Sequence, residues 1–449
     1  MRDLLLVIII LGSVPFCFRN PCFGVMMWYW VSYFNPHRFT WSFAYNFPVA
    51  LLVAVPTLAG TIFARKSLRA LLVWESVCLA AVWLWFSFTY VNAKGIPLFA
   101  EHMENASYEM SHISKILLMT FVMILVVNSR DKLRGVMIVS AVSLGLLAVK
   151  GMLFGIRTGG EDRVWGPPDS FLADNNALAL ALNMAIPILF FLAREEKNRY
   201  VRWGLRVCFF CSIASVLLTY SRGGLLGLAV VLTAITFKSH QKALGAFLLA
   251  VAAVLTLSFA PETWMDRMAH FTHGELDSSA KQRLVAWETA WNFSHDYPIA
   301  GGSFDTLPDV NVFRLYQLSE LPERDYRPAT AAHSIYFQLL SDQGFVGLGL
   351  FLAMIASCLW SLWRIKRAVR KITSARWLMS YADMIQIAIL GFMISGAFLG
   401  FVYLDVIYQM VATVVVLKVM FRVEVAGYLS QLGEKETLQV VPEEVAVPA

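Results

Sequence analysis

The chain has 449 residues, of which 58% are apolar and only 15% are charged. Soluble domains carry roughly 25% charged residues, so this composition excludes a soluble globular protein and indicates an integral membrane protein. Basic turns between apolar segments account for the formal net charge of +6, so the charge gives no reason to expect a nucleic-acid partner.

Thirteen apolar segments are candidate membrane spans, and many approach the roughly 20 residues that a helix needs to cross a bilayer. In chain order they are Asp3–Phe18, Cys22–Phe34, Phe47–Phe63, Leu71–Tyr90, Ile113–Asn128, Gly135–Phe154, Asn176–Ala193, Trp203–Tyr220, Gly223–Phe237, Ala243–Ala260, Gly344–Trp363, Met384–Tyr403 and Val406–Phe421. The first two are short and are split by Arg19-Asn20-Pro21, so they form either two helices or one broken unit. The predicted fold is an all-α polytopic membrane protein with about 12 helices, 12 to 13 in all.

Lys/Arg-rich turns predict the orientation of these spans, because short basic turns stay on the inner side of the membrane. From residue 47 onward, basic turns alternate with turns that carry less positive charge. The outer side then receives residues 91–112, 155–175, 221–224 and 261–332. The predicted domains are an N-terminal bundle (1–260), a large outer loop with short helices (261–333), C-terminal spans (334–422) and an inner tail (423–449) whose composition predicts disorder.

The outer loop Gly155–Asn175 is dense in glycine and proline and carries Arg157 and Arg163. This composition predicts an irregular loop with a fixed shape and local positive charge. At its end, Asp174-Asn175-Asn176 is typical of a cap for the following helix. We expect Arg157 and Arg163 to be secondary contacts for an anionic substrate.

The turn Tyr220-Ser221-Arg222-Gly223-Gly224 joins two predicted spans. Its two glycines permit a tight turn and a close approach of the backbone to a ligand. An arginine at membrane depth is costly, and its planar fork suits phosphate oxygens. Arg222 is therefore a candidate phosphate ligand, and the alternative is an interfacial arginine that reaches lipid headgroups.

The stretch Lys281–Trp291 has the pattern of a helix within the large outer loop. Leu284, Trp287 and Trp291 recur at helical spacing and predict one apolar stripe. Arg283 lies at the edge of that stripe. It is either a second phosphate ligand or a solvated cation at the start of the helix.

The tetrapeptide His333-Ser334-Ile335-Tyr336 lies where the chain re-enters the membrane, and His333 is predicted to open a helix. A neutral histidine accepts a proton from a hydroxyl group near neutral pH, so His333 is a candidate general base. Tyr336 follows about one turn later and is a candidate substrate contact. The alternative is a histidine that only caps the helix at the interface.

The sequence predicts neither a metal site nor a cofactor. His270 and His273 have the spacing of a metal-ligand pair, but no further ligands accompany them. Nucleotide-binding loops, dinucleotide fingerprints and hydrolase elbows are missing from the sequence. Chemistry that depends on a bound nucleotide is therefore not indicated.

Together these motifs resemble the O-antigen ligase and polymerase family of bacterial membrane glycosyltransferases. The matching pieces are, in order, Tyr220-Ser221-Arg222-Gly223-Gly224, the Arg283–Trp287 helix followed by Pro298 and Gly301-Gly302, and His333-Ser334-Ile335-Tyr336 with Gly344. The motif matches extend from about residue 155 to 350, and the similarity in topology covers the whole chain. The start of the chain and residues 164–176 look closer to a subgroup, the O-glycosylation ligases found beside exosortase systems.

The resemblance implies an enzyme of the bacterial inner membrane whose active site and outer loop face the periplasm. It implies transfer of a glycan from undecaprenyl diphosphate to an acceptor hydroxyl on a lipid A-core sugar or a protein. Arg222 and Arg283 would bind the diphosphate, and His333 would be the base. Direct attack by the acceptor would invert the anomeric carbon, and the activated donor would require no metal.

Two alternatives remain open at this stage. A polysaccharide polymerase would use the same scaffold and the same donor. A lipid-linked oligosaccharide transporter would need charged residues along a path through several spans. Glu75, Lys150, Asp383 and Asp405 are the few candidates for such a path, and most of them lie near the ends of spans.

Overall fold

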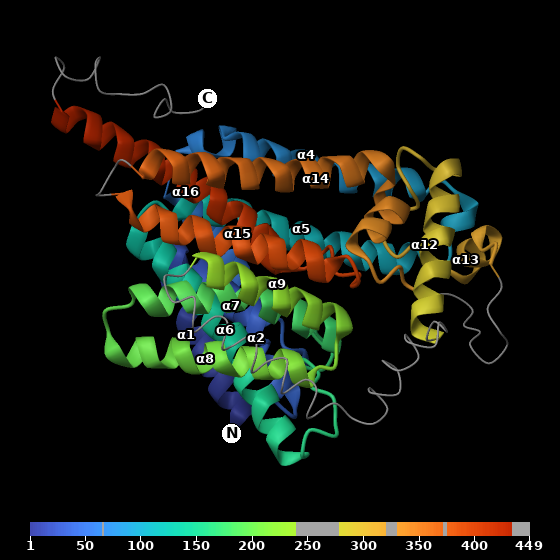
Figure 1. Cartoon of the computed structure of the whole chain (residues 1–449), viewed down its shortest axis with the longest axis horizontal. Helices are drawn as coiled ribbons and strands as arrows, with labels where there is room; N and C mark the ends of the chain where they lie inside the picture. Colours follow the sequence, from blue (N-terminus) through green and yellow to red (C-terminus); the bar gives the residue numbers. More distant parts are fainter. Residues whose placement is uncertain (65–66, 239–277, 320–329, 371–374, 433–449) are drawn as a thin grey trace.

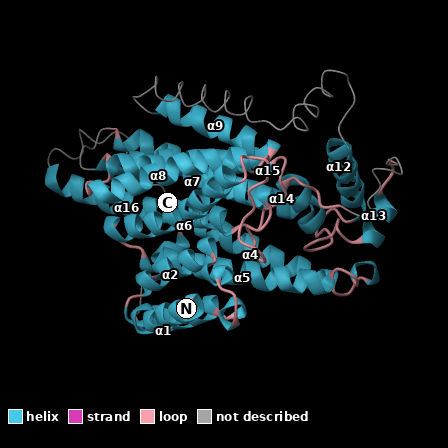
Figure 2. Cartoon of the chain, turned by 90° about the horizontal axis from the view of Figure 1, so that it is seen from below, coloured by secondary structure: helices cyan, strands magenta, loops and turns pink. Residues whose placement is uncertain are grey.

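The computed structural model describes residues 1–64, 67–238, 278–319, 330–370 and 375–432, and every regular element in these ranges is a helix (Figures 1 and 2). The α-helices are α1 (Arg2–Arg19), α2 (Pro21–Phe34), α3 (Val49–Phe63), α4 (Trp74–Ala93), α5 (Met103–Val126), α6 (Arg130–Arg157), α7 (Asn175–Glu195), α8 (Arg199–Leu218), α9 (Arg222–Lys238), α12 (Ser278–Asp296), α13 (Val310–Tyr316), α14 (Ile335–Val369), α15 (Trp377–Gly396) and α16 (Asp405–Leu432). Short 3-10 helices lie in the connections: η1 (Pro36–Phe39), η2 (Phe43–Asn46), η3 (Leu68–Leu72) and η4 (Pro97–Phe99).

Eight of the described helices are long and apolar enough to cross a membrane, namely α4, α5, α6, α7, α8, α14, α15 and α16. The all-helical, multi-pass character is therefore confirmed for the described residues, whereas the count of about 12 spans stays a prediction. Four more predicted spans coincide with α1, α2, α3 and α9, which are shorter or carry more charge. The predicted span Ala243–Ala260 lies outside the described residues.

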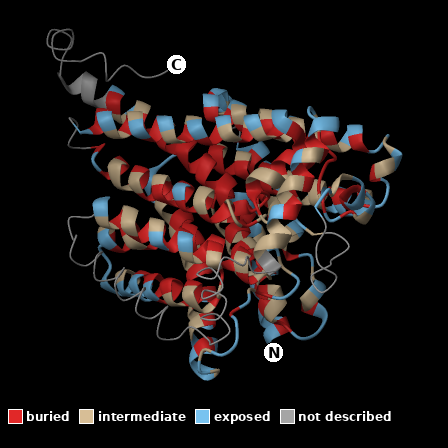
Figure 3. Ribbon diagram, turned by 45° about the vertical axis from the view of Figure 1, so that its right-hand side comes forward, coloured by how far each residue is buried: buried red, intermediate tan, exposed pale blue. Residues whose placement is uncertain are grey.

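The bundle is built around α7 and α16. Every residue of α7 from Ala177 to Leu189 is buried, and so is every residue of α16 from Val406 to Leu417. A helix that is apolar on all sides needs neighbours on all sides, and the remaining helices supply them. Figure 3 shows this buried centre, with partly exposed residues toward the outside.

The connections gather at two ends of the bundle. At one end, Tyr45 donates a hydrogen bond to Asp169, and Asn311 Nδ2 donates to Glu101 Oε2 at 2.5 Å. This end holds the connections on the predicted outer side, and we call it the site end. At the opposite end, Arg134 pairs with Glu196. The turns therefore segregate as the basic pattern predicts, while the membrane face that each end meets stays a prediction.

Helix α15 ends seven residues earlier than the predicted span Met384–Tyr403, because it stops at Gly396. The following residues, 397–404, are apolar but are not helical, and Leu399 and Val402 within them are fully buried. The prediction is wrong here because apolar composition reports burial and carries no information on whether a short segment is helical.

Helix α14 begins at Ile335 with Ser334 at its N-cap, so His333 precedes the helix and does not belong to it. Within α14, Gly344 has φ 68° and ψ −177°, which breaks the helix into two parts.

At the C-terminal end of the described chain, α16 continues to Leu432, whereas the predicted span ends at Phe421. Residues 433–449 of the predicted tail lie outside the described residues.

Candidate active site

Arg222 is the first residue of α9 and lies at the site end of the bundle. The hydroxyl of Ser221 accepts a hydrogen bond from the Gly224 amide at 3.0 Å, which caps the helix. The preceding residue, Tyr220, has a left-handed backbone conformation with φ 53°. Arg222 is half-buried. The positive charge of the arginine and the positive end of the helix dipole both favour a bound anion.

Gly223 allows the start of α9 to pack directly on the segment that follows α15. A Cβ atom on Gly223 would lie 3.1 Å from Phe398 Cβ and 3.2 Å from Leu399 Cγ. On another face of the same turn, a Cβ on Gly224 would lie 2.6 Å from Ala179 Cβ. The two glycines in the motif are therefore explained by close packing of α9 against its neighbours.

Arg283 lies in the first part of α12, a helix that crosses the site end of the bundle (Figure 1). Trp287 attaches this helix to the chain just before α14. Its Nε1 donates a hydrogen bond to the Ala332 carbonyl at 2.7 Å, and its ring stacks on Phe337 with 5.1 Å between centroids. Arg283 is one helical turn before Trp287, so both lie on the same face of α12.

The apolar stripe predicted for α12 is only partly right. Trp287 packs against the bundle, but Leu284 and Trp291 are 48% and 49% exposed. The buried face is formed by smaller residues and one phenylalanine, namely Val285, Ala286, Thr289, Ala290 and Phe293. Spacing alone therefore identified the helix but not the face that it buries.

His333 has a left-handed backbone conformation with φ 45°, which is uncommon for a residue other than glycine. Such conformations cost about 1–3 kcal/mol and persist where the surrounding structure enforces them, often at functional sites. Here the neighbours are Ala332, which is held by Trp287, and Gly400. A Cβ on Gly400 would lie 3.4 Å from His333 N and 3.5 Å from its Cα.

The segment Phe398-Leu399-Gly400 joins the three candidate residues. The glycine after Arg222 packs on Phe398 and Leu399. The Trp287 ring lies 6.3 Å from the Phe398 ring, one turn from Arg283. Gly400 lies against the backbone of His333. The sequence did not indicate this segment, because its residues look like the end of a membrane span.

The loop before α13 packs into the break in α14, which explains the motif glycines at positions 301 and 344. Both have a left-handed backbone, with φ 61° for Gly301 and 68° for Gly344. A Cβ on Gly344 would lie 2.2 Å from the Ile299 carbonyl oxygen. The Phe345 amide donates to the Pro298 carbonyl at 2.8 Å, so this loop is bonded to the second part of α14.

Two carboxyl groups, one from this loop and one from α14, share a cavity with the residues that neighbour His333. Asp305 and Asp342 line a small cavity of about 30 Å³, together with Ala332 and Gly400. Burial raises the pKa of Asp305, and the charge of His102 opposes that rise. The Asp342 carboxyl accepts hydrogen bonds from the Tyr403 hydroxyl at 3.0 Å and from the Thr306 amide at 3.2 Å.

His102 is a residue of this region that the sequence did not single out. It is buried, with Nδ1 2.7 Å from Asp309 Oδ2 and Nε2 2.9 Å from the Gly302 carbonyl. It therefore links the connection before α5 to the loop that packs into the α14 break. Its partners are about 200 positions away in the chain, so no local pattern identifies this role.

Arg157 is the last residue of α6, and the loop that follows it carries Arg163 and is tied to the turn that precedes Arg222. The Tyr220 hydroxyl donates to the Gly160 carbonyl, and the Val164 amide donates to the Leu218 carbonyl at 3.0 Å. Burial raises the pKa of Tyr220. Arg157 at the end of α6 and Arg163 in the loop are both exposed, so their role as substrate contacts stays a prediction.

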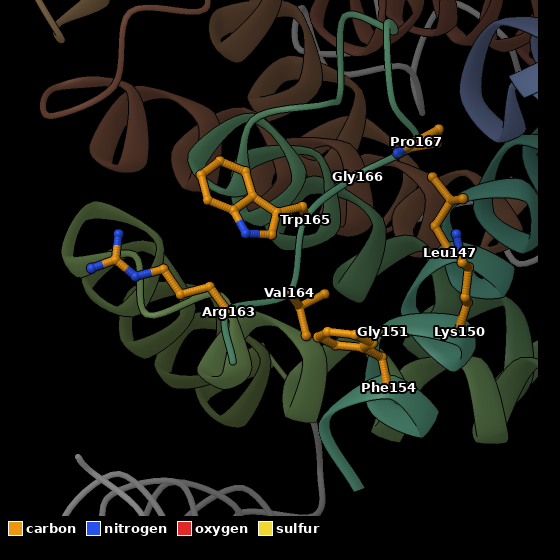
Figure 4. Close-up of a pocket in the computed structure, with 9 residues that line it drawn as sticks. All are labelled: Leu147, Lys150, Gly151, Phe154, Arg163, Val164, Trp165, Gly166 and Pro167. Atoms are coloured by element: carbon orange, nitrogen blue, oxygen red, sulfur yellow. The ribbon is translucent and has the colours of Figure 1, made fainter. Parts of the chain in front are cut away.

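Arg163 lines a cavity of about 240 Å³ between this loop and α6. In Figure 4 its guanidinium extends away from Lys150 and Leu147 on the opposite wall. The Lys150 ammonium lies 4.1 Å from the Phe39 ring centroid. The two cations therefore do not converge on one point within this cavity.

Tyr336 faces α15. Its hydroxyl donates a hydrogen bond to the Met393 carbonyl at 3.0 Å, so the Tyr336 side chain links α14 to α15. Its role as a substrate contact stays a prediction. His270 and His273, the weak metal-site candidates, lie outside the described residues.

Comparison with known proteins finds family models that match two parts of the chain. Residues 207–352 match the family model described as O-antigen ligase, and residues 1–197 match the model of a family of unknown function. The chain matches no curated protein. The first match contains Arg222, Arg283 and His333, whereas the narrower exosortase-associated subgroup stays a prediction. The match at residues 207–352 supports assignment of the chain to the O-antigen ligase family, whose members are membrane glycosyltransferases.

Proposed function

We propose that the protein transfers a glycan from undecaprenyl diphosphate to an acceptor hydroxyl at the site end of the bundle. This end would face the periplasm, with the bundle in the bacterial inner membrane. The observation that carries the proposal is the convergence of the Arg222 helix, the Arg283 helix and His333 on Phe398-Leu399-Gly400. The first two supply cations and the third supplies a proton acceptor, which are the groups that such a transfer needs.

The chemistry assigns a role to each group. His333 takes the proton from the acceptor hydroxyl as its oxygen forms a bond to the anomeric carbon. The bond from that carbon to the diphosphate breaks, and the diphosphate leaves on its lipid. Arg222 and Arg283 stabilise the charge that develops on the leaving oxygens. Attack from the side opposite the leaving group inverts the anomeric configuration.

Two of the four charged candidates for a transport path, Glu75 and Asp383, are paired inside the bundle, which argues against the transporter alternative. Glu75 pairs with Lys418 at 3.2 Å, and Asp383 pairs with Lys366. A substrate path would require polar groups that face open space. These pairs are instead consistent with fixed contacts between helices.

A deletion strain tests the proposal and separates ligase from polymerase. If the protein is a ligase, full-length glycan accumulates on the lipid carrier and is missing from lipopolysaccharide or glycoprotein. If it is a polymerase, the polymer itself is lost. Complementation with His333→Ala should reproduce the deletion phenotype while the variant accumulates in the membrane. Normal glycan transfer by that variant would refute the role of His333 as base.

The donor is already activated by its diphosphate, so the proposed reaction is independent of metal. Transfer by purified protein should continue in the presence of a chelator. Activity that is lost on chelation and restored by a divalent cation would contradict the proposed mechanism and direct attention to His270 and His273.

A further inference from the structure

A second pocket at the site end lies outside the residues assigned to catalysis. Its volume is about 230 Å³, and it opens between α2, α5 and the connection that follows α6. Its wall is formed by residues 28–38, Ala50 and residues 108–116, 169–172 and 404–405. All but the last of these fall within residues 1–197, the part that matches a family of unknown function. We call it the N-terminal pocket.

The N-terminal pocket contains charges of both signs. Arg38 and Lys115 supply positive charge, and Asp169 and Asp405 supply carboxyl groups. The Asp169 carboxylate accepts a hydrogen bond from Tyr45, and Asp405 accepts one from Ser32. A simple anion would meet these two carboxyl groups, and a simple cation would meet Arg38 and Lys115. The pocket therefore favours a ligand that both donates and accepts hydrogen bonds.

Several buried polar atoms of this pocket are available to form hydrogen bonds with such a ligand. Arg38 Nε, His37 Nδ1 and His112 Nε2 are buried and have no hydrogen-bond partner among the described residues. The nearest carboxyl oxygen to His112 Nε2, on Asp405, is 3.8 Å away, which is too long for a hydrogen bond. Buried polar atoms without partners are costly, so a bound hydroxyl or a water molecule is expected to meet them.

Aromatic rings form the other part of the lining. The Phe171 ring stacks on His112 with 3.4 Å between centroids and is 37% exposed. Tyr108 lies one turn from His112 on α5, with its ring parallel to Phe171 at 6.1 Å, and is 64% exposed. A sugar has an apolar face of C–H groups and a rim of hydroxyl groups. Exposed aromatic faces beside mixed polar groups match both parts of such a ligand.

We propose that the N-terminal pocket binds a sugar residue of the acceptor substrate. This inference rests on the proposed function, because it names the substrate that brings its hydroxyl to His333. The pocket volume is somewhat below the roughly 300 Å³ of the smallest sites for drug-sized ligands, so it suits about one ring.

The position of the pocket relative to His333 supports this assignment. Leu404 and Asp405 line the pocket, and Gly400 of the same segment contacts the His333 backbone. Four residues of extended chain span at most about 14 Å. A short acceptor glycan held in the pocket therefore lies within reach of the base.

The division of the chain between two families indicates which substrate the pocket holds. The candidate catalytic residues fall in the region that matches the O-antigen ligase family, whereas most of the pocket falls in the other region. A lipid diphosphate handled by the first region leaves the acceptor as the substrate for the second. Phe171 and Asp169 belong to the loop that is hydrogen-bonded to Tyr220 beside Arg222, so this loop connects the pocket to the Arg222 turn.

A binding experiment tests the pocket without requiring activity. The probes are three methyl glycosides, of glucose, galactose and N-acetylglucosamine, added to full-length protein in lipid nanodiscs. Saturation-transfer difference NMR should detect at least one glycoside on both the wild type and His333→Ala. Phe171→Ala and Arg38→Gln should weaken that binding by about tenfold or more.

The matched control is Trp165→Ala, because Trp165 is an exposed aromatic residue of the same loop that does not line this pocket. It should bind the glycoside like the wild type. Phe171→Tyr keeps the ring and should also bind, which separates a lost contact from a misfolded loop. The proposal is wrong if no glycoside gives a signal on the wild type, if the signal persists in Phe171→Ala and Arg38→Gln, or if inorganic phosphate displaces it.

A transfer assay then distinguishes the acceptor from the donor. Phe171→Ala should raise KM for the acceptor by about tenfold while KM for the lipid-linked donor stays unchanged. A change confined to the donor KM would overturn the assignment to the acceptor. If the wild type shows no transfer at all, the proposed function fails, and the NMR result still reports independently whether the pocket binds a sugar.

Discussion

Gly400, in the connection between α15 and α16, lies directly against the backbone of His333, which lies just before α14. A Cβ on Gly400 would be 3.4 Å from His333 N. His333 has φ 45°, so its backbone conformation depends on what surrounds it. The position of the candidate base is therefore coupled to a glycine that is distant in sequence and has no reactive side chain.

Replacing Gly400 by valine should push the His333 backbone away, because the Cβ alone already reaches contact distance and the added methyl groups exceed it. A misplacement of about 1 Å at a reacting group costs about 100-fold in rate, so we expect a loss of that order. Glycan transfer is measured in the complemented deletion strain, with protein level determined by immunoblot. Gly349→Val is the matched control, since a Cβ on Gly349 meets nothing within 4 Å. Equal activity of the two variants would contradict the coupling.

Trp287 should control the position of Arg283. Trp287→Phe keeps an aromatic ring on Phe337 but removes the hydrogen bond to Ala332, which is worth about 1 kcal/mol. Trp287→Ala removes both contacts and should reduce transfer much further. The same substitution at Trp291, one turn later and 49% exposed, is the control and should have a small effect. Loss of activity in Trp291→Ala as great as in Trp287→Ala would show that α12 is only generally sensitive to truncation.

Arg222→Lys should be severely impaired although it keeps the charge. A lysine offers a point charge, whereas the arginine fork bonds two oxygens of a diphosphate at once. Loss of one such stabilising contact in a transition state typically costs about 100-fold or more in rate. The measurement is the rate of transfer by purified protein at saturating acceptor. A fully active Arg222→Lys variant would remove the diphosphate role, and Arg206→Lys, a substitution on the outer face of α8, serves as the control for expression.

The helical class and the site helices were predictable because their signals are local. Apolar composition identified the bundle, and the spacing of Trp287 and Trp291 identified α12. Arg222 was noticeable because a charged residue in an apolar chain needs a reason. Each of these inferences uses information within a few residues of the feature that it describes.

The contacts between those elements were not predictable in the same way. The segment 397–404 reads as the end of a span, because hydropathy cannot distinguish a buried loop from a buried helix. The left-handed conformation of His333 could not be predicted, because this position is not a glycine or an asparagine, the residues that usually adopt it. His102 depends on Asp309 and Gly302, which lie about 200 positions away. A single sequence carries no signal for such long-range pairs.

His37 predicts how the stability of the protein depends on pH. Burial lowers its pKa to about 4 from a usual value of 6.5, and the neighbouring Arg38 contributes to the shift. Because the folded state holds His37 neutral, the unfolded state binds a proton more readily between these two values. The free energy of unfolding should therefore fall as the pH drops below about 6.5, and this contribution should stop changing below about pH 4.

His37→Gln removes this titration, so the variant should lose less stability than the wild type between pH 7 and pH 5. The expected difference is at most about 1 kcal/mol, because His37 is only partly buried and solvent screens part of the effect. Thermal unfolding of both proteins in the same detergent at each pH measures it. Above pH 7 the histidine is neutral in both states, so the two proteins should then respond to pH in parallel. Parallel curves throughout the acidic range as well would show that the environment of His37 does not oppose its protonation.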